Sequence, residues 1–532
     1  MANESAVEQH YDYVVVGAGS AGSVVANRLS ADPGNRVLLL EAGRESHFWS
    51  RIPVGFAKLI DNPAANWCYE SEPEKGTNNR KIPVPRGRLL GGSSSINGMV
   101  FVRGQAQDYD MWAQLGNRGW SYTDVLPMFK RMESYSGGND EFRGRDGPLK
   151  VHDHGASGPF YDALFAAGAQ IGLPRNEDYN GAAQDGMSLT QATIRNGRRM
   201  STAYCYLDPA RSRLNLTILA NATAEQLLIE DARCTGLRYS VGGQTHVARA
   251  ACEVIVSAGA INSPQLLELS GIGNPEILVS QGIPVNHALL GVGENLRDHL
   301  APRLLWEIEQ SGVAYTQGLG LLWEGIKYAL TRKGLLSLPA SPIRGYARSR
   351  EGLEAPDIGM AFFPFMSRNF KLTSEPGLTA IPHQLRPEST GSIHIKTSEP
   401  NTAPAINFNF LSAELDRQVI VESVHVTRKI MQAPAMHGIR GKELAPGPEV
   451  QTDDEILAWV RAAAETVYHP VGTCKMGSDP MAVVDQRLRV HGIAGLRVAD
   501  ASIMPTLTSG NTNAPSIMIG EQAAQLILDD HA

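Results

Sequence analysis

The stretch YVVVGAGSAG, which begins at Tyr13, constrains the fold of this 532-residue chain more than any other. Its β-branched apolar run predicts a buried parallel strand, because both faces of such a strand must be apolar. The run enters the pattern G-x-G-x-x-G, and residues 23–30 then have the pattern of a helix. Gly17 permits a tight turn, Gly19 lets the backbone approach a pyrophosphate, and Gly22 lets the helix pack closely on the strand.

A second apolar strand ends in Glu41, about twenty residues after the glycines, where a carboxylate can accept hydrogen bonds from a ribose diol. A G-x-G-x-x-G pattern on its own is a weak indication. Here a strand precedes it, a helix follows it and an acid ends the next strand. The sequence therefore predicts a dinucleotide site with the pyrophosphate at a helix N-terminus.

Composition narrows the class of protein. At 532 residues the chain is too long for a single ordinary core, which predicts two domains. Hydrophobic residues make up 42% and charged residues 19%, as in a globular protein. The 48 basic and 55 acidic residues give a net charge of −7, which argues against a nucleic-acid partner because such binding needs a basic surface.

Neither a metal site nor a membrane span is indicated. The five cysteines are scattered, with no C-x-x-C pair or cysteine–histidine cluster at ligand spacing, so we expect reduced thiols and no structural metal. No apolar run approaches the roughly 20 residues that cross a bilayer. The polar segment 1–10 lacks the pattern of a signal peptide. These features predict a cytoplasmic location and leave peripheral membrane contact open.

A second glycine-rich segment, residues 86–100, has the sequence RGRLLGGSSSINGMV. Its adjacent glycines and three serines offer many N–H and hydroxyl donors, which suit a polar, anionic or heteroaromatic ligand. A flexible linker is the alternative interpretation. Apolar residues at Ile96 and at 99–102 favour a segment that enters a core.

These segments resemble a known family. Residues 86–100 are similar to the first signature of the glucose-methanol-choline (GMC) oxidoreductases, and residues 259–273 (GAINSPQLLELSGIG) are similar to the second. The resemblance runs from Tyr11 to the C-terminus and is closest to the bacterial choline, sorbose and polyethylene-glycol dehydrogenases. It implies FAD as the cofactor and an alcohol as the substrate.

The expected fold class is α/β (α+β overall). We expect a Rossmann-like FAD-binding domain from the discontinuous segments 1–150, 202–302 and 455–532, and an inserted substrate-binding domain, with an antiparallel sheet and helices, from 151–201 and 303–454. Local patterns predict strands at 214–224, 226–230, 253–259, 392–396 and 405–409, a helix that starts at Pro264 and stops by Gly271, and helices at 413–432 and 516–528.

Oxidising an alcohol with a flavin needs a base for the hydroxyl proton and a carbinol carbon held beside the flavin N5 atom. Histidine suits the first task because its ordinary pKa lies near neutrality. By resemblance, His469 is this general base, and Pro470 restricts its backbone to extended geometry. The rival histidines are His299, His383 and His491, each with a structural or solvated alternative role.

The motif NTNAP, which begins at Asn511, stands at the predicted start of the last helix, where free backbone N–H groups face a bound group. By resemblance, Asn513 is the partner of His469 and donates a hydrogen bond to the substrate oxygen, and Tyr468 completes the substrate site. The glycine patterns and the resemblance together assign to FAD the residues Gly17, Gly19, Ser20, Ala21, Gly22, Glu41, Ala42, Arg88, Gly91, Gly92, Ser93, Ser95, Asn97, Gly98, Met99, Val100, Ala224, Ala258, Gly259, Asp500, Ala501, Asn511 and Thr512.

Two departures from the family pattern matter. Choline oxidases attach FAD covalently through a histidine of the glycine–serine segment, where this chain has Ile96, so we expect non-covalent FAD. Choline oxidases also carry a glutamate for the trimethylammonium group, at a position held here by Ala301. Tyr468 could still stack on a cation, but the missing carboxylate favours an uncharged alcohol over choline.

The predicted function is FAD-dependent oxidation of an uncharged primary alcohol, glycol, polyol or sugar to the aldehyde or ketone, with hydride transfer to flavin N5. Electrons would pass to an external acceptor such as a quinone or a cytochrome. An oxidase that reduces O₂ to H₂O₂ is the nearest alternative. A non-redox lyase on the same scaffold and a non-enzymatic flavin-binding protein are the others. The particular alcohol, the acceptor and the oligomeric state are left open.

Overall fold

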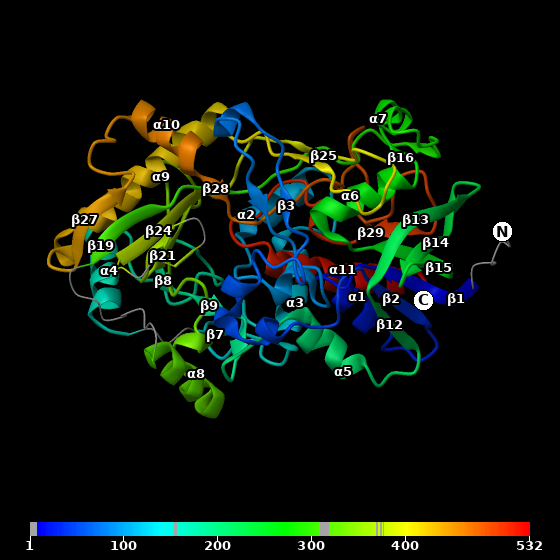
Figure 1. Cartoon of the computed structure of the whole chain (residues 1–532), viewed down its shortest axis with the longest axis horizontal. Coiled ribbons are helices and arrows are strands. Elements are labelled where there is room, and N and C mark those ends of the chain that lie inside the picture. The colour runs from blue at the N-terminus through cyan, green and yellow to red at the C-terminus, as the bar shows by residue number, and fades with distance from the viewer. Residues whose placement is uncertain are drawn as a thin grey trace.

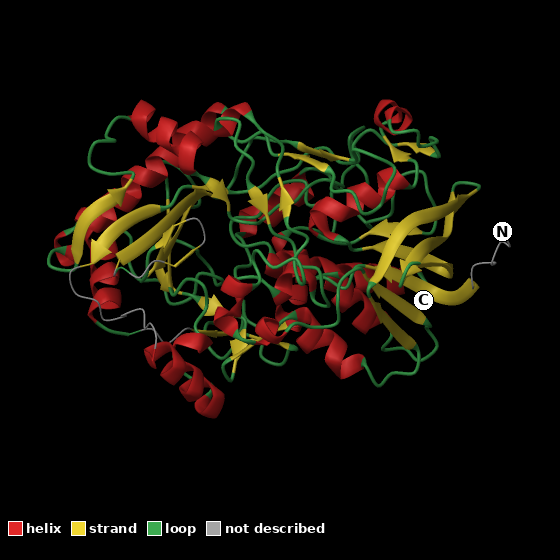
Figure 2. Cartoon of the chain, in the orientation of Figure 1, coloured by secondary structure: helices red, strands yellow, loops and turns green. Residues whose placement is uncertain are grey.

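The computed structural model has two sheets at opposite ends of the long axis, with helices and long loops between them, as Figure 1 and Figure 2 show. The structure describes residues 8–153, 157–308, 319–368, 371–372, 375 and 377–531. The expectation about segment 1–10 therefore lies mostly outside the described residues.

Strand β1 (Glu8–Val16) is central to a seven-stranded sheet. Its apolar half is buried and pairs in parallel with β2 (Val37–Glu41) and β15 (Gln244–Val256). The long β15 has two neighbours on its other edge, because its first half pairs antiparallel with β14 (Arg233–Val241) and its last three residues pair in parallel with β29 (Leu496–Val498). The sheet is completed by β12 (Leu216–Ala220) beside β2 and by β13 (Ala222–Glu230) beside β14.

The first and last long helices pack against each other beside this sheet. They are α1 (Gly22–Leu29) and α11 (Asn513–Asp530). Gly520 of α11 permits the close approach, since a Cβ there would lie 2.7 Å from the Ala21 carbonyl oxygen. This packing places the start of α11 beside the first glycine turn, although the two are almost the full chain length apart in sequence.

A six-stranded antiparallel sheet forms the opposite region. Its strands, in spatial order, are β27 (Arg440–Ala445), β19 (Leu304–Ile308), β24 (Gly377–Gln384), β21 (Ile358–Phe363), β20 (Ile343–Ala347) and β8 (Gly186–Leu189). Helices α4 (Pro159–Gln170) and α9 (Glu414–Gln432) cover one face. Met360, Phe362 and Leu378 are fully buried in the apolar cluster on that side, so the alternate residues of the same strands point to the other face.

Several predicted elements are confirmed. The helices predicted at 23–30 and 413–432 are α1 and α9, and the strands predicted at 392–396 and 405–409 are the antiparallel pair β25 (Ser392–His394) and β26 (Ala405–Asn407). This pair packs against α6 (Gly259–Leu269) and not on the six-stranded sheet. The predicted strand break at residue 225 was wrong: the break falls at Asn221, where φ is +55°, and β13 runs on through Ala224.

The predicted start of a helix at Pro264 was also wrong, because α6 begins five residues earlier, at Gly259. A proline inside a helix leaves the carbonyl four residues before it without an N–H partner. That carbonyl belongs to Ala260, and it accepts a hydrogen bond from the Thr473 hydroxyl at 2.6 Å. A distant segment thus supplies the missing donor, and the helix tolerates its proline. Helix α11 likewise begins at Asn513, ahead of the predicted residue 516.

Shorter elements connect the two sheets. The remaining helices are α2 (Ala106–Gln114), α3 (Tyr122–Met132), α5 (Asp208–Ala210), α7 (Pro275–Ser280), α8 (Leu319–Thr331) and α10 (Asp453–Ala463). The remaining strand pairs are β3 (Tyr69–Glu70) with β4 (Pro83–Val84), β5 (Glu133–Ser134) with β6 (Leu149–Lys150), β7 (His152–Asp153) with β9 (Gln191–Ala192), β10 (Ile194–Arg195) with β11 (Arg198–Arg199), β16 (Ile272–Gly273) with β17 (His287–Ala288), β18 (Leu300–Ala301) with β28 (Glu465–Thr466), and β22 (Ser367–Arg368) with β23 (Lys371–Leu372).

The described residues contain neither a membrane-spanning helix nor a cluster of metal-binding side chains. None of the helices in the described ranges combines the length and the apolar character needed to cross a bilayer. The same ranges hold no cluster of three or more histidine, cysteine, aspartate or glutamate side chains that could bind a metal ion.

Candidate active site

A cavity of about 740 Å³ is lined by residues of both regions. One side comes from the ends of β1 and β2 and from the first turns of α6 and α11, and the other side comes from β20, β21 and β24. The predicted site residues that line it are Gly17, Gly19, Ser20, Ala21, Glu41, Ala42, Gly92, Ser93, Asn97, Gly98, Met99, Val100, Ala224, Ala258, Gly259, Tyr468, His469, Asp500, Ala501, Asn511, Thr512 and Asn513.

Four residues predicted to contact FAD do not line the cavity, and two of them are glycines that hold the turn together. A Cβ on Gly22 would lie 2.0 Å from the Gly17 carbonyl oxygen, so this glycine serves the close packing of α1 on the turn. The N–H of Gly91 donates to the Ala18 carbonyl oxygen at 2.7 Å. Gly91 thus ties the second glycine segment to the first.

The other two have polar side chains directed elsewhere. The Ser95 hydroxyl donates to the Leu90 carbonyl oxygen at 2.8 Å. The Arg88 guanidinium stacks on the Trp67 ring, with 4.4 Å between the guanidinium carbon and the ring centroid. Both side chains support the walls of the cavity without reaching its surface.

Gly19 leaves open the space that a pyrophosphate would need. A Cβ built on it would meet only one protein atom, the Ser257 carbonyl oxygen, at 4.0 Å. A Cβ on Gly17 would lie 2.5 Å from the same oxygen. The unfilled side of Gly19 therefore faces the cavity, as expected where a ligand approaches the backbone closely.

Three helix N-termini contribute to the same cavity. Ala21 precedes α1, Gly259 begins α6 and Asn513 begins α11, and all three residues line it. Unpaired N–H groups and the helix dipole give each of these ends a partial positive charge. An anionic diphosphate fits this arrangement, and so does a ring system that becomes negatively charged on reduction.

Glu41 stands where an adenosine ribose is expected. Its two carboxylate oxygens accept hydrogen bonds from the N–H groups of Ala18, at 3.1 Å, and Gly43, at 2.8 Å. Burial raises the pKa of Glu41 to about 7. Each oxygen retains a lone pair, so the residue can still accept hydrogen bonds from a diol.

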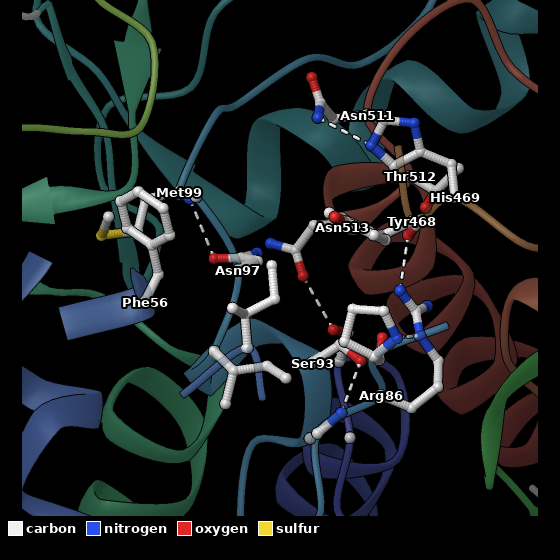
Figure 3. A pocket seen from close by; sticks show the side chains of 18 of the residues that line it. Phe56, Arg86, Ser93, Asn97, Met99, Tyr468, His469, Asn511, Thr512 and Asn513 are labelled. Atoms are coloured by element: carbon white, nitrogen blue, oxygen red, sulfur yellow. Dashed lines mark hydrogen bonds between the residues drawn. The ribbon is translucent and has the colours of Figure 1, made fainter. Parts of the chain in front are cut away.

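The glycine–serine segment packs directly on the first glycine turn. A Cβ on Gly92 would lie 2.8 Å from the Gly19 Cα atom, and φ of Gly92 is +50°. Farther along, the Asn97 Oδ1 atom accepts from the Met99 N–H at 3.0 Å and from Arg199 Nη1 at 2.7 Å. Asn97 is thereby fixed with its amide at the cavity, as Figure 3 shows.

His469 lies in a chain of hydrogen bonds that sets its tautomer. The His299 Nε2 atom is 2.9 Å from the Leu385 carbonyl oxygen, which can only accept, so His299 carries its proton on Nε2. Burial lowers the pKa of His299 to about 4, so the ring is neutral and its Nδ1 atom accepts. His469 Nδ1, 3.0 Å away, therefore donates to His299, and the Nε2 atom of His469 is left unprotonated.

The structure pairs His469 with Asn511, and the predicted pairing with Asn513 is corrected. The Asn511 Nδ2 atom lies 2.8 Å from His469 Nε2 (Figure 3). Asn513 instead accepts a hydrogen bond from the Ser20 hydroxyl at 2.8 Å, at the first glycine turn. The physical reason is that Asn513 is the first residue of α11, which packs on α1, whereas Asn511 lies in the loop before it.

The backbone beside His469 is held in a conformation that residues with side chains seldom adopt. Tyr468 has a φ of +72°. Its carbonyl oxygen accepts from Arg86 Nη2 at 2.7 Å, and the N–H of His469 donates to Asp298 Oδ1 at 2.8 Å (Figure 3 shows the first of these). Strain of this kind is retained where the surrounding structure fixes a side chain for function.

Sequence reasoning missed Asp298 and treated His299 only as a rival base. Both belong to the segment GVGENLRDH at 291–299, which resembles a family segment near the FAD, and that resemblance was the available signal. Burial raises the pKa of Asp298 to about 6, and its carboxylate accepts from the backbone of both histidines. These residues position His469 without lining the cavity themselves.

The other two rival histidines have different surroundings. His383 lines the cavity, and its ring adjoins that of His299 with 5.3 Å between centroids. His491 is outside the cavity lining, and its Nε2 atom donates to the Gly477 carbonyl oxygen at 3.0 Å. Among the histidines considered, only His469 has an unprotonated nitrogen paired with an amide at the cavity.

The electrostatics of His469 lead to an expected pH dependence. Burial lowers the pKa of His469 well below 6.5, and the neighbouring His299 and His383 and the positive charges of Arg86 and Arg344 lower it further. A base must be unprotonated, so a lowered pKa moves the loss of activity to lower pH. At about pH 6 an ordinary histidine is roughly three-quarters protonated. We therefore expect the anaerobic rate of flavin reduction to keep most of its plateau value at about pH 6. A stopped-flow pH series measures this rate, and an apparent pKa at or above about 6.5 would contradict the expectation.

Two carboxylates line the described cavity, and both are engaged by the backbone. Glu41 binds the first glycine turn, and Asp500 accepts from the Gly259 N–H at 2.8 Å. Besides the rings of His299 and His383, the charged side chains that lower the pKa of His469 are the cations Arg86 and Arg344. Negative charge near His469 comes from Asp298, which lies against the backbone of the histidine and not in the cavity lining.

The fold and the cavity are those of a dinucleotide-dependent oxidoreductase. The sequence models of the N-terminal and C-terminal domains of GMC oxidoreductase match residues 11–301 and 387–520. The chain belongs to the GMC oxidoreductase family and is an FAD-dependent alcohol dehydrogenase of that family.

Known proteins similar to the chain cover nearly its whole length. It is 43% identical over 537 residues to an oxygen-dependent choline dehydrogenase of Pseudomonas fluorescens (strain Pf0-1), covering 98% of this chain and 94% of that one. The crystal structure of pyridoxine 4-oxidase from Mesorbium loti is 31% identical with a TM-score of 0.90, covering 98% and 99%. A structure of formate oxidase from Aspergillus oryzae RIB40 is 25% identical with a TM-score of 0.91, also covering 98% and 99%.

Proposed function

We propose that this protein oxidises an alcohol to the corresponding carbonyl compound with His469 as the general base. The observation that carries the proposal is the hydrogen-bond chain from Leu385 through His299, which leaves the Nε2 atom of His469 unprotonated. That atom would take the hydroxyl proton of the bound alcohol. The amide of Asn511, now 2.8 Å from Nε2, would then donate to the substrate oxygen.

The residues fit FAD as the cofactor. Gly19 and the N-terminus of α1 would hold the pyrophosphate, and Glu41 would accept from the ribose. When bound, FAD supplies the acceptor for the hydride that leaves the carbinol carbon. Ile96 is buried at the cavity wall and has no nucleophilic atom, which supports non-covalent attachment.

We propose that the division into domains follows the two sheets. Every strand of the seven-stranded sheet falls within 1–150, 202–302 and 455–532, and every strand of the six-stranded sheet falls within 151–201 and 303–454. The β25–β26 pair belongs to the second set by sequence, yet His394 reaches Glu268 of α6 at 2.7 Å. This pair would therefore form part of the contact between the domains.

The proposed substrate differs from choline, which appears in the names of the similar dehydrogenases. Ala301 is buried and packs against Ala361 and Ile381, so it offers no charge to a trimethylammonium group. The cations Arg303 and Arg344 both line the cavity. We therefore propose that the alcohol carries no positive charge, with choline as the alternative that the relatives suggest.

The electron acceptor is proposed to be an external quinone or cytochrome. Reduction of O₂ is the competing possibility, because the relatives include proteins named oxygen-dependent dehydrogenases and structures named oxidases. Anaerobically reduced enzyme exposed to air separates the two. Stoichiometric H₂O₂ would establish an oxidase, and its absence, with rapid turnover on a quinone or dye, would establish a dehydrogenase.

An anaerobic substrate screen tests the proposed function. The purified holoprotein should be yellow, and its absorbance near the flavin maximum should bleach on addition of a suitable alcohol. The screen should include glycols, sugars, aliphatic and aromatic alcohols, and choline. We expect bleaching with one or more of the uncharged or anionic alcohols and not with choline. Bleaching with choline alone would overturn the proposed specificity, and no bleaching with any alcohol would favour non-redox chemistry.

A further inference from the structure

Arg344 is a buried cation without a counter-ion. It lies in β20 and is 3% exposed. Within the described residues its guanidinium makes one hydrogen bond, from Nε to the Tyr346 hydroxyl at 3.1 Å. Its two terminal nitrogens donate to no group in the described ranges, and no described carboxylate lies within ion-pair distance of it.

The other cationic side chains that line the cavity either interact with a protein group or are exposed to solvent. Arg303 pairs with Glu465 at 3.0 Å. Arg86 donates to the Tyr468 carbonyl oxygen and lies in the field of Asp298, which raises the pKa of Arg86 against the lowering effect of burial. Lys58 is exposed to solvent. Arg344 is thus the exception among the described cations that line the cavity.

An unpaired buried guanidinium destabilises a protein, because desolvation of the charge is not offset by a partner. A ligand that brings an anion into the cavity would offset that cost. With Nε engaged by Tyr346, the two terminal nitrogens remain as a planar pair of donors. This pair matches the two oxygens of a carboxylate.

The wall around Arg344 is mainly apolar, with Thr379 and His383 as polar side chains of the same sheet. Arg344 is the register partner of Ala361 in β21, and Phe363 and Ile381 lie on the same cavity-facing side of the sheet. The loop that leads into β20 touches the glycine–serine segment, where the Ala340 N–H donates to the Gly98 carbonyl oxygen at 3.2 Å. Arg344 is therefore a charged side chain on the wall of the cavity that the six-stranded sheet provides.

Arg344 and the base share one compartment. The charge of Arg344 lowers the pKa of His469 and of its neighbours His299 and His383. An alcohol with an anionic group could therefore place its hydroxyl at His469 and its anion at Arg344 in the same cavity.

We propose that Arg344 binds a carboxylate of the substrate, so that the alcohol this protein oxidises is a hydroxy acid. The proposal rests on the proposed function, because it takes His469 as the place where the hydroxyl is held. It competes with the prediction, made from the sequence, of an uncharged alcohol. Arg344 would then select the substrate by charge, while the apolar wall accommodates the carbon skeleton between the two polar groups.

Matched acid and amide substrates test the proposal on the holoenzyme. The pairs are p-(hydroxymethyl)benzoate with its amide, and ω-hydroxyhexanoate with its amide. For whichever of the two acids is the better substrate, we expect kcat/KM to be roughly 10- to 100-fold higher than for its amide, mainly because KM is lower. Arg344→Met, which keeps the side-chain volume and removes the charge, should abolish that preference, and Arg344→Lys should retain part of it. Arg303→Met is the control, and it should leave the acid-to-amide ratio unchanged.

A binding measurement gives a readout that does not depend on oxidation. Calorimetric titration with p-methylbenzoate and p-methylbenzamide, which have no hydroxyl group to oxidise, should show binding of the acid by the wild-type holoprotein and roughly 10-fold or greater weakening in Arg344→Met. If the acid binds in this way but no alcohol is oxidised, the result would support the role of Arg344 and contradict the proposed alcohol oxidation.

Other results would overturn the role of Arg344. Equal use of acid and amide by the wild type would do so while leaving the proposed oxidation intact. If Arg344→Met loses activity equally towards the acid and the amide, Arg344 supports the structure and does not select the substrate. Failure of the wild type to bind p-methylbenzoate or to favour either acid would also end the proposal.

Discussion

Replacing His469 by alanine should slow anaerobic flavin reduction by about 100- to 10,000-fold, while FAD stays bound. The expected loss is large because the Nε2 atom is the unprotonated nitrogen that the His299 hydrogen bond leaves at the cavity. FAD should stay bound because the glycine turns and Glu41, which would hold it, are unchanged by the substitution. Stopped-flow absorbance with the best alcohol of the screen measures the rate, and the flavin spectrum of the purified variant measures retention.

The two asparagines provide the matched control. Asn511→Ala removes the amide beside His469 and should lower the rate of flavin reduction by roughly 100-fold, as the loss of one donor to a developing oxyanion does. Asn513→Ala removes the acceptor of the Ser20 hydroxyl and should change FAD affinity more than the reduction rate. A His469→Ala enzyme that reduces its flavin within a few-fold of the wild-type rate would show that another group is the base.

Replacing Gly19 by valine should yield a folded protein that loses FAD during purification. Apart from its chain neighbours, the nearest described atom to a Cβ at this position is the Ser257 carbonyl oxygen, at 4.0 Å, so the added side chain would extend into the cavity and not into the fold. Overpacking of this kind costs about 1–3 kcal/mol, which is roughly a 5- to 150-fold rise in the FAD dissociation constant. Calorimetric titration of the apoprotein with FAD, alongside the thermal unfolding temperature, measures both effects.

Substitutions at Gly19 and at nearby Gly22 distinguish weaker FAD binding from lower stability of the fold. Gly19→Ala should give a smaller rise in the dissociation constant, because a methyl group intrudes less than an isopropyl group. Gly22→Ala should lower the unfolding temperature instead, since its Cβ would lie 2.0 Å from the Gly17 carbonyl oxygen. A Gly19→Val protein that purifies with a full complement of FAD would show that the pyrophosphate lies elsewhere.

The sequence was most informative where the physical cause is local. The apolar run before Gly17 had to become a buried strand, and the glycines that follow had to form a turn, because backbone conformation and close packing permit little else. The period of the apolar residues at 413–432 likewise predicted α9 nearly residue for residue. Family likeness then located the cavity lining with few exceptions, such as Arg88 and Ser95.

Local rules failed where a distant group changed the outcome. Proline was expected to begin α6, but the Thr473 hydroxyl supplies the donor that lets the helix run through Pro264. The motif NTNAP offered two asparagines as partners of His469, and only the packing of α11 on α1 assigns Asn511 to the histidine and Asn513 to the glycine turn.

By itself, the sequence predicted the dinucleotide-binding turn, because that turn depends on glycines at fixed spacing, and its resemblance to a known family indicated the cofactor and the candidate base. The tertiary structure alone decided which nitrogen of His469 is free, which asparagine faces it and which cation lacks a counter-ion. Those properties depend on contacts between segments far apart in sequence, and such contacts exist only once the two sheets have closed around the cavity.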